Sequence, residues 1–503
     1  MTQPTDAASN LGMTLEMADS AVYDRAVQRF SENGIRLPTF AQLADPSTLP
    51  ADAVAQLDGV DRDEPDPRNL FRVHWFNSLD GAGPIDVPDY IELPSELTGV
   101  DARIVLALGN RFPMIRAHKV LAAYACLAPS IVTGAFDPTS SRAIWPSTGN
   151  YARGGVAISR IMGCRGVAVL PEGMSRERFE WLDRWIGDPG DVIRTYGTES
   201  NVKEIYDACN ELAKDPTNVI FNQFNQFWNH MGHYAVTGRA LEAVYESATA
   251  ATPGSRLSAY ISASGSGGTL GAGDYLKDHH GAKIVAVEAL ECPTMLYNGF
   301  GEHNIQGIGD KHIPLIHNVM NTDVAVAISD SSTDALHTLF NTPAGRAHLV
   351  DSVGCEPELV ESLVHMGYSS ICNALAAIKT AKHYRMTSDD VIVTVATDGS
   401  EMYTSELSEY IDEHHAGGFG DADAAAVFAQ HLGAVDTSHF LEMGEVEKNR
   451  IFNLGYFTWV EQQGTEFADF EARRNQDFWS SMRTMMTELD EHIVEFNART
   501  GLG

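Results

Sequence analysis

The sequence contains no apolar run that approaches the ~18–20 residues needed to cross a lipid bilayer. Its N-terminal stretch, MTQPTDAASNLGMTLEMADS, has neither a basic start nor an apolar centre, so we expect no secretory signal. We therefore expect a cytoplasmic protein.

Cysteine is also scarce. The six cysteines are scattered singly and none forms a CxxC pair, which argues against a disulfide framework. We expect small buried thiols at these positions, which are Cys126, Cys164, Cys209, Cys292, Cys355 and Cys372.

Basic residues are few as well. The 35 Lys and Arg residues face 68 Asp and Glu residues, which gives a formal net charge of −33. A nucleic acid or an anionic membrane needs clustered positive charge, so neither is expected as a partner. The hydrophobic share of 44% is that of an ordinary globular protein.

The order of elements predicts an α/β protein with mainly parallel sheets and two extensions. Residues 1–87 are rich in Asp, Pro and Ala, with one helix expected over 20–33. In the core, 88–412, predicted strands cover 103–108, 166–170, 217–221, 257–263, 283–289, 324–329 and 390–397. Predicted helices cover 119–128, 153–162, 175–185, 202–214, 233–247 and 369–384. After 412 the strands stop, and 413–503 is expected to be a helical extension that supports assembly or a lid.

The segment RLSAYISASGSGGTLGAGDYLK is the most specific local pattern. A strand ends at Ala263 and a helix starts near Leu270. Glycines let a ligand approach the backbone closely, hydroxyls add donors, and the helix N-terminus favours an anion. The residues of this candidate phosphate cradle are Gly265, Ser266, Gly267, Gly268 and Thr269.

Three interpretations of this loop compete. A dinucleotide site would use Glu288 to hold a ribose, but Leu270 stands where the third glycine of GxGxxG is needed. A glycine-rich turn without a ligand is the second interpretation. The third is a cradle for the phosphate of pyridoxal phosphate (PLP).

Several motifs follow one another in a fixed order: ARIVLALGNRFPMIRAHKVLAAYA, PSTGNYARGG, a PEGMS turn, QFNQFWNHMGHYAVTG, GSGGTLGAGDYLK, IQGIGDKHIP and GYSSICNALAAIK. Together they resemble the cysteine synthase and cystathionine β-synthase family of fold type II PLP enzymes, over roughly residues 88–410. The resemblance implies two α/β domains with PLP in the cleft between them.

Lys119 is the residue that the resemblance matches to the Schiff-base lysine. Taken alone, a lysine at the start of a helix is an ordinary solvated residue. In the family position it would bind the cofactor, remove the α-proton of the substrate and return it. Desolvation would lower its pKa, which suits both tasks.

The turn before the predicted helix 153–162 can also be interpreted in two ways. From the residues alone it is a helix N-cap. The resemblance implies that it binds the substrate carboxylate, that Asn150 contacts the phenolic oxygen of PLP, and that Gln223 also reaches the carboxylate. Tyr151 stands where the family has a smaller residue. The turn consists of Ser147, Thr148, Gly149, Asn150 and Tyr151.

The segment ATDGSEMY should supply the group that faces the pyridine nitrogen. We favour the hydroxyl of Ser400, which would leave that nitrogen largely unprotonated. Asp398 is the alternative, and its charge would favour a pyridinium. Asp398 could also simply begin a turn with Gly399.

Histidines occur in the pairs His230 with His233 and His279 with His280. None has Cys, Asp or Glu clustered at ligand spacing, so no metal site is expected.

The resemblance implies β-replacement or β-elimination on a serine-, O-activated serine- or cysteine-type amino acid, through an aminoacrylate intermediate, in a homodimer. An ammonia-lyase of the threonine or diaminopropionate type is the main alternative. A nicotinamide-dependent oxidoreductase and a catalytically inactive interaction subunit are more distant alternatives.

Overall fold

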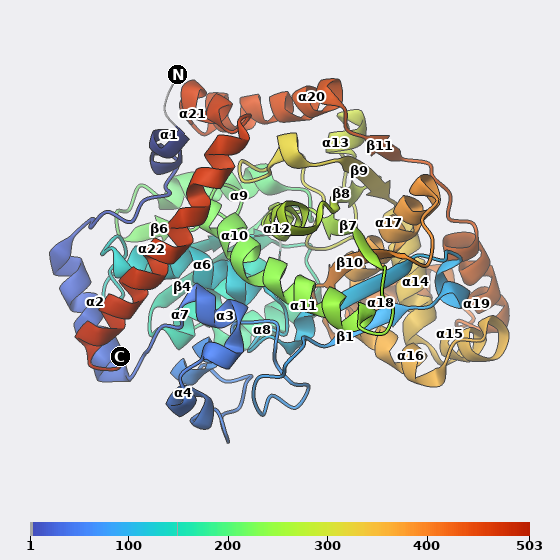
Figure 1. Cartoon of the computed structure of the whole chain (residues 1–503), viewed down its shortest axis with the longest axis horizontal. Helices are drawn as coiled ribbons and strands as arrows, with labels where there is room; N and C mark the ends of the chain where they lie inside the picture. Colours follow the sequence, from blue (N-terminus) through green and yellow to red (C-terminus); the bar gives the residue numbers. More distant parts are fainter. Residues whose placement is uncertain (1–3, 148) are drawn as a thin grey trace.

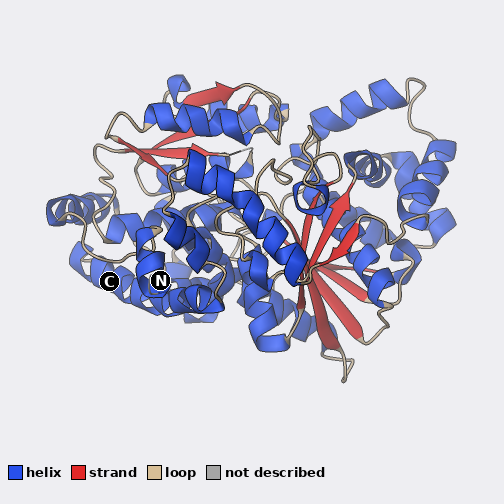
Figure 2. Cartoon of the chain, turned by 90° about the horizontal axis from the view of Figure 1, so that it is seen from above, coloured by secondary structure: helices blue, strands red, loops and turns tan. Residues whose placement is uncertain are grey.

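The computed structural model describes residues 4–147 and 149–503, so the predicted site residue Thr148 lies outside the described residues. Their strands form two sheets, which Figure 2 shows as separate groups surrounded by helices. The larger sheet has the order β1 (Tyr90–Leu93), β2 (Arg103–Leu108), β10 (Asp390–Ala396), β7 (Arg256–Ala263), β8 (Lys283–Ala289), β9 (Val324–Ile328), β11 (Phe440–Glu442). The smaller sheet has the order β5 (Val192–Thr195), β4 (Arg165–Pro171), β3 (Arg142–Pro146), β6 (Asn218–Ile220).

Neighbouring strands in the described residues are parallel except for two edge pairs, β1 with β2 and β11 with β9. The inner strands β10 and β8 are buried almost throughout, because helices cover both faces of the sheet. The predicted α/β class with mainly parallel sheets is therefore confirmed.

Three helices follow strands and begin with or just after predicted site residues. Helix α6 (Lys119–Val132) follows β2, α7 (Asn150–Ile161) follows β3, and α12 (Leu270–His280) follows β7. In parallel α/β sheets ligands bind beyond the carboxyl ends of the strands. This arrangement brings three predicted site segments towards one place.

The remaining helices surround the two sheets (Figure 1). They are α3 (Phe40–Ala44), α4 (Ala51–Ala55), α5 (Ser95–Thr98), α8 (Arg176–Trp185), α9 (Val202–Leu212), α10 (Phe227–Gly232), α11 (Gly238–Thr249), α13 (Thr294–Tyr297), α14 (Asp330–Asn341), α15 (Pro343–His348), α16 (Pro357–Ser362), α17 (Tyr368–Tyr384), α18 (Thr404–His414) and α19 (Asp421–Phe428).

The two ends of the chain pack together. Helix α22 (Gln476–Thr500) runs past α1 (Pro4–Asn10) and α2 (Ser20–Asn33), as Figure 1 shows. The ring of Phe496 in α22 lies 5.2 Å from that of Phe30 and 5.6 Å from that of Tyr23. The N-terminal extension and the C-terminal helix thus share one apolar cluster with the core.

The C-terminal segment, residues 413–503, consists of helices joined by loops, with one short strand. It contains η10 (Ala429–Gly433), α20 (Glu445–Tyr456), η11 (Phe457–Gln462) and α21 (Phe467–Ala472) in addition to α19 and α22. The expectation that strands stop after 412 is wrong for Phe440–Glu442, which pairs with β9 as an added edge strand. Three residues are too few for a recognisable period-2 pattern.

All six cysteines are buried and free. In the part of the chain that the structure describes, no helix combines the length and apolar character of a membrane span. The same residues contain no group of three or more His, Cys, Asp or Glu side chains that could hold a metal ion.

Candidate functional site

A cavity lies at the carboxyl ends of strands from both sheets. Most of the predicted site residues line it: Lys119, Ser147, Gly149, Asn150, Tyr151, Gln223, Gly265, Ser266, Gly267 and Thr269. Residues that were not predicted also line it: His118, Phe224, Ala263, Gln306, Gly307, Ile308, Ser369, Asn373, Val395 and Thr397. Gly268, Asp398 and Ser400 are not in its wall.

Lys119 is the first residue of α6, and its side chain reaches into this cavity. Its Nζ donates to Gln223 Oε1 at 3.2 Å and to Ser266 Oγ at 3.3 Å. Burial lowers the pKa of Lys119 to about 8, although the charge of Asp310 acts in the opposite direction. About a tenth of the amine is therefore neutral at pH 7, and this neutral form can act as a nucleophile or base.

Two glycines of the cradle stand where a side chain would collide with neighbouring atoms. A Cβ atom at Gly265 would lie 2.5 Å from the carbonyl oxygen of Gly307, and one at Gly268 would collide with Asn229 Oδ1. The segment leads into α12, whose N-terminal amides favour an anion. An open backbone next to a buried lysine fits the phosphate and the aldehyde of PLP.

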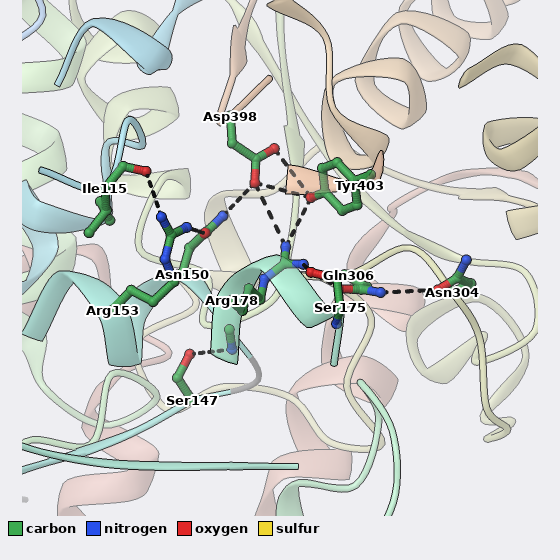
Figure 3. A network of polar contacts seen from close by, with 11 residues as sticks. Ile115, Ser147, Asn150, Arg153, Ser175, Arg178, Asn304, Gln306, Asp398 and Tyr403 are labelled. Atoms are coloured by element: carbon green, nitrogen blue, oxygen red, sulfur yellow. Dashed lines mark hydrogen bonds and ion pairs between the residues drawn. The ribbon is translucent and has the colours of Figure 1, made fainter. Parts of the chain in front are cut away.

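The side chains of Ser147 and Asn150 form the main hydrogen bonds of the loop before α7. Ser147 Oγ accepts from Gly149 N at 3.0 Å, and a Cβ atom at Gly149 would lie 2.8 Å from Arg178 Nε. Asn150 Nδ2 donates to Asp398 Oδ2 at 2.7 Å, and Asn150 Oδ1 accepts from Arg153 Nη1 at 2.9 Å (Figure 3). The amide predicted to contact PLP thus has both of its groups bonded to protein.

Arg178 is the centre of the buried network in Figure 3. Its Nη1 donates to Ser175 Oγ at 2.7 Å and to Gln306 Oε1, and its Nη2 donates to Tyr403 OH at 3.0 Å. Asp398 lies 3.8 Å away and accepts from Tyr403 OH at 3.0 Å. The network connects α8, the cavity-lining turn at Gln306 and the segment after β10.

The two candidates for the pyridine nitrogen lie outside the cavity wall, whereas their neighbour Thr397 is in it. The Asp398 carboxylate is occupied by Asn150 and Tyr403. Ser400 begins the short helix η9 (Ser400–Met402). Sequence reasoning treated Thr397 as the end of a strand, and its hydroxyl was the available signal.

Two other polar side chains near the cavity were missed. Both ring nitrogens of His118 are buried without a hydrogen-bond partner among the described residues, and its ring stacks on Trp75 at 5.6 Å. Both carboxyl oxygens of Asp310 are likewise buried and unpartnered in this set. Burial raises the pKa of Asp310 to about 8. Asp310 stands in the quoted segment IQGIGDKHIP, but its burial has no local sequence signal.

Glu288 does not offer the carboxylate that a dinucleotide site would need. Its two oxygens accept from Met295 N and Leu296 N, both at 2.8 Å, at the start of α13. The interpretation of Glu288 as a ribose-binding residue is therefore wrong.

Comparison with known proteins agrees with this geometry. The family described as "Pyridoxal-phosphate dependent enzyme" matches residues 91–339. Cysteine synthase B of Campylobacter jejuni is 28% identical over 257 residues, which is 50% of this chain and 75% of that protein. A probable cysteine synthase of Bacillus subtilis is 29% identical over 293 residues, 57% of this chain and 84% of that protein.

Solved structures show the same fold. The O-acetylserine-dependent cystathionine β-synthase of Helicobacter pylori has a TM-score of 0.51 and 20% identity, covering 63% of this chain and 94% of that chain. A cysteine synthase of Entamoeba histolytica has a TM-score of 0.53 and 20% identity, covering 69% and 94%. The sequence and family matches confirm the predicted resemblance and the predicted cofactor.

Proposed function

Because the chain belongs to the pyridoxal-phosphate-dependent enzymes of fold type II, we propose that it catalyses β-replacement or β-elimination on a serine-, O-activated serine- or cysteine-type amino acid. The observation that carries this function is the buried Lys119 amine, held between Gln223 and Ser266 beside the glycine cradle.

Lys119 and the cradle would hold the cofactor, with the phosphate against the amides of Gly265–Thr269. When bound, PLP supplies an electron sink for the negative charge that develops at the α-carbon of an amino acid. Lys119 removes the α-proton and later returns it. The pKa of about 8 that burial gives Lys119 suits both steps near neutral pH.

The loop before α7 would orient the substrate. Its amides lie at the N-terminus of α7, where a carboxylate is favoured. We assign this role to Ser147, Gly149 and Tyr151 together with Gln223, and keep Asn150 as the residue that would contact the phenolic oxygen of PLP. Gln223 Nε2 donates to Ser147 Oγ at 3.4 Å, so one side chain joins the carboxylate loop to Lys119. Thr148 completes this predicted loop.

Thr397 replaces Ser400 as our candidate to face the pyridine nitrogen, because Thr397 lies in the cavity wall. A hydroxyl carries no full charge, so it favours the protonated nitrogen less than a carboxylate does. Asp398 instead neutralises the buried Arg178.

The relatives named cysteine synthases favour β-replacement over the ammonia-lyase alternative. The nicotinamide alternative loses its support because Glu288 caps a helix. We further propose a division into an N-terminal extension 1–87, a catalytic core 88–412 and a C-terminal extension 413–503, a homodimeric assembly and a cytoplasmic location.

Product analysis tests the reaction. The chain loaded with PLP is incubated with serine, O-acetylserine or cysteine, with and without sulfide or an organic thiol, and the products are identified by mass spectrometry. We expect a β-substituted amino acid when a nucleophile is present, and a keto acid with ammonia if elimination competes. Lys119→Ala is the control and should form neither. A PLP-loaded chain that consumes none of these substrates would contradict the proposal.

A further inference from the structure

The signature loop, residues 303–318, lines the cavity but has no regular secondary structure of its own. It supplies Gln306, Gly307 and Ile308 to the cavity wall. A buried loop without helix or strand pairing depends on other segments to bond its backbone groups. The position of the cavity wall therefore depends on what holds this loop.

The core holds the loop from one side. Gly309 N donates to the carbonyl oxygen of Ser264 at 3.0 Å, next to the phosphate cradle. Leu315 N donates to the carbonyl oxygen of Phe224 at 2.9 Å. These bonds use amide groups of the loop and leave carbonyl groups to be satisfied elsewhere.

The C-terminal segment satisfies two of those carbonyl groups with side chains. Trp459 Nε1 donates to the carbonyl oxygen of Ile313 at 2.7 Å, and Arg473 Nη1 donates to that of Leu315 at 2.6 Å. Trp459 is 1% exposed and Arg473 is 3% exposed. Both donors therefore act where water does not compete with them.

Arg473 is held in place by aromatic rings of the same segment. Its guanidinium lies 4.7 Å from the ring centre of Phe452 and 4.4 Å from that of Phe470. Burial lowers the pKa of Arg473 to about 9. Arg473 forms no ion pair among the residues that the structure describes, and a buried guanidinium without a counter-charge is costly. Its hydrogen bond to the carbonyl oxygen of Leu315 offsets part of this cost.

Trp459 also contacts a junction between the loop and the half of the molecule that contains the smaller sheet. Its ring centre lies 5.7 Å from that of His312 in the loop and 6.1 Å from that of Tyr206 in α9. Tyr206 OH and His312 Nε2 are hydrogen-bonded at 2.9 Å. One tryptophan thus touches the loop and a helix beside the smaller sheet.

We propose that Trp459 and Arg473 are positioning residues of the cofactor site. They act through the carbonyl groups of Ile313 and Leu315, and so fix the turn at Gln306–Ile308 in the cavity wall. The C-terminal extension thereby contributes to the geometry of the site without contacting cofactor or substrate. This inference rests on the proposed cofactor site and makes no assumption about the reaction type.

Trp459→Phe tests the inference, because phenylalanine keeps an aromatic ring but cannot donate to Ile313. The control is Asn497→Ala. Asn497 is also buried in the C-terminal segment and donates its Nδ2 at 2.8 Å, but to the carbonyl oxygen of Leu37 rather than to the loop or to either positioning residue. Hydrogen–deuterium exchange of peptides from 303–318 is measured on the PLP-free chains. PLP retention and the visible circular dichroism of bound PLP are measured on the loaded chains.

We expect Trp459→Phe to exchange faster in 303–318, to alter the visible circular dichroism and to retain PLP roughly threefold to tenfold more weakly, the effect of losing one hydrogen bond. Asn497→Ala should leave all three unchanged at a comparable loss of thermal stability. Equal behaviour of the two variants, or unchanged loop exchange in Trp459→Phe, would overturn the inference. If the unmodified chain took up no PLP, the proposed cofactor site would fail instead.

Arg473→Met provides a second variant at the other carbonyl group. It removes the donor to Leu315 while keeping an apolar side chain beside Phe452 and Phe470. We expect the same three changes as for Trp459→Phe. A folded Arg473→Met chain with unchanged exchange in 303–318 would exclude Arg473 from the positioning role.

Discussion

Asn150 Nδ2 donates to Asp398 Oδ2 at 2.7 Å, and this bond ties the loop before α7 to the segment after β10. Because β3 and β10 belong to different sheets, the bond joins the two halves of the site. Asp398 also lies beside the fully buried guanidinium of Arg178. The carboxylate therefore has a structural partner on each side.

The first prediction concerns Asp398→Asn. The change keeps the shape of the side chain but removes one of the two buried carboxylates, Asp398 and Glu199, whose charges raise the pKa of Arg178. We expect the free energy of unfolding to fall by about 3 kcal/mol, the lower end of the cost of breaking a buried ion pair, because Glu199 remains. Urea denaturation of the PLP-free chain measures it. Ser400→Ala, a buried residue outside this network, should change stability by no more than about 1 kcal/mol, the typical effect of a single substitution. Equal effects of the two changes would contradict the structural role of Asp398.

The second prediction identifies the cofactor lysine. Borohydride reduction of the PLP-loaded chain, followed by proteolysis and mass spectrometry, should find the pyridoxyl group on Lys119. The reason is that its buried amine, with the pKa lowered to about 8, lies in the cavity wall beside the cradle. Lys379, whose amine donates to the carbonyl oxygen of Ser438 at 3.0 Å, serves as the internal comparison. A label on another lysine, or none, would refute the assignment.

The third prediction concerns the cradle. In Gly268→Ala the new Cβ atom would collide with Asn229 Oδ1, and Asn229 Nδ2 donates to Ser266 Oγ at 3.3 Å. The collision must therefore displace the residue next to the cradle. We expect at least roughly tenfold weaker PLP retention, which corresponds to about 1.4 kcal/mol, as measured by equilibrium dialysis.

Gly417→Ala is the control for this change, because nothing lies within 4 Å of the added Cβ atom. It should retain PLP as the unmodified chain does. Undiminished retention in Gly268→Ala would show that the phosphate lies elsewhere.

Sequence patterns predicted the fold best where a strand is covered on both faces. The apolar runs 103–108 and 283–289 match β2 and β8 residue for residue. Strands β3 and β5 of the smaller sheet were missed. β3 (RAIWP) ends in proline, and β5 (VIRT) lies at the sheet edge with only its last residue buried, so neither gives a long apolar run.

The ordered motifs predicted half of the residues in the cavity wall. Two further residues with a proposed role, Thr397 and Trp459, were missed. Thr397 was passed over because it is the last residue of the predicted strand 390–397. Trp459 contacts Ile313 across 146 positions of sequence, and no local periodicity reports such a contact. A single sequence shows which segments form elements more readily than which distant side chains meet.

The last prediction uses the buried carboxyl group of Asp310, whose pKa is raised from 3.8 to about 8. A group whose pKa is higher in the folded chain gives its full stabilisation below the unfolded pKa and loses it as pH rises through the folded pKa. We therefore expect this carboxyl group to lower the free energy of unfolding between about pH 4 and pH 8 by several kcal/mol, since one pKa unit is worth about 1.4 kcal/mol.

Burial also raises the pKa of Glu288 and of Asp334 to about 8. Several groups therefore contribute to the pH dependence of the unfolding free energy of the unmodified chain. The contribution of Asp310 is isolated as the difference between the unmodified chain and Asp310→Asn, from urea denaturation of the PLP-free proteins at successive pH values. The free energy of unfolding of Asp310→Asn, relative to that of the unmodified chain, should increase as pH rises from about 4 to about 8, because asparagine cannot ionise. Above about pH 8 this relative value should stay constant. A flat difference for Asp310→Asn would mean that Asp310 is ionised in the folded chain throughout this range and has a partner for its charge.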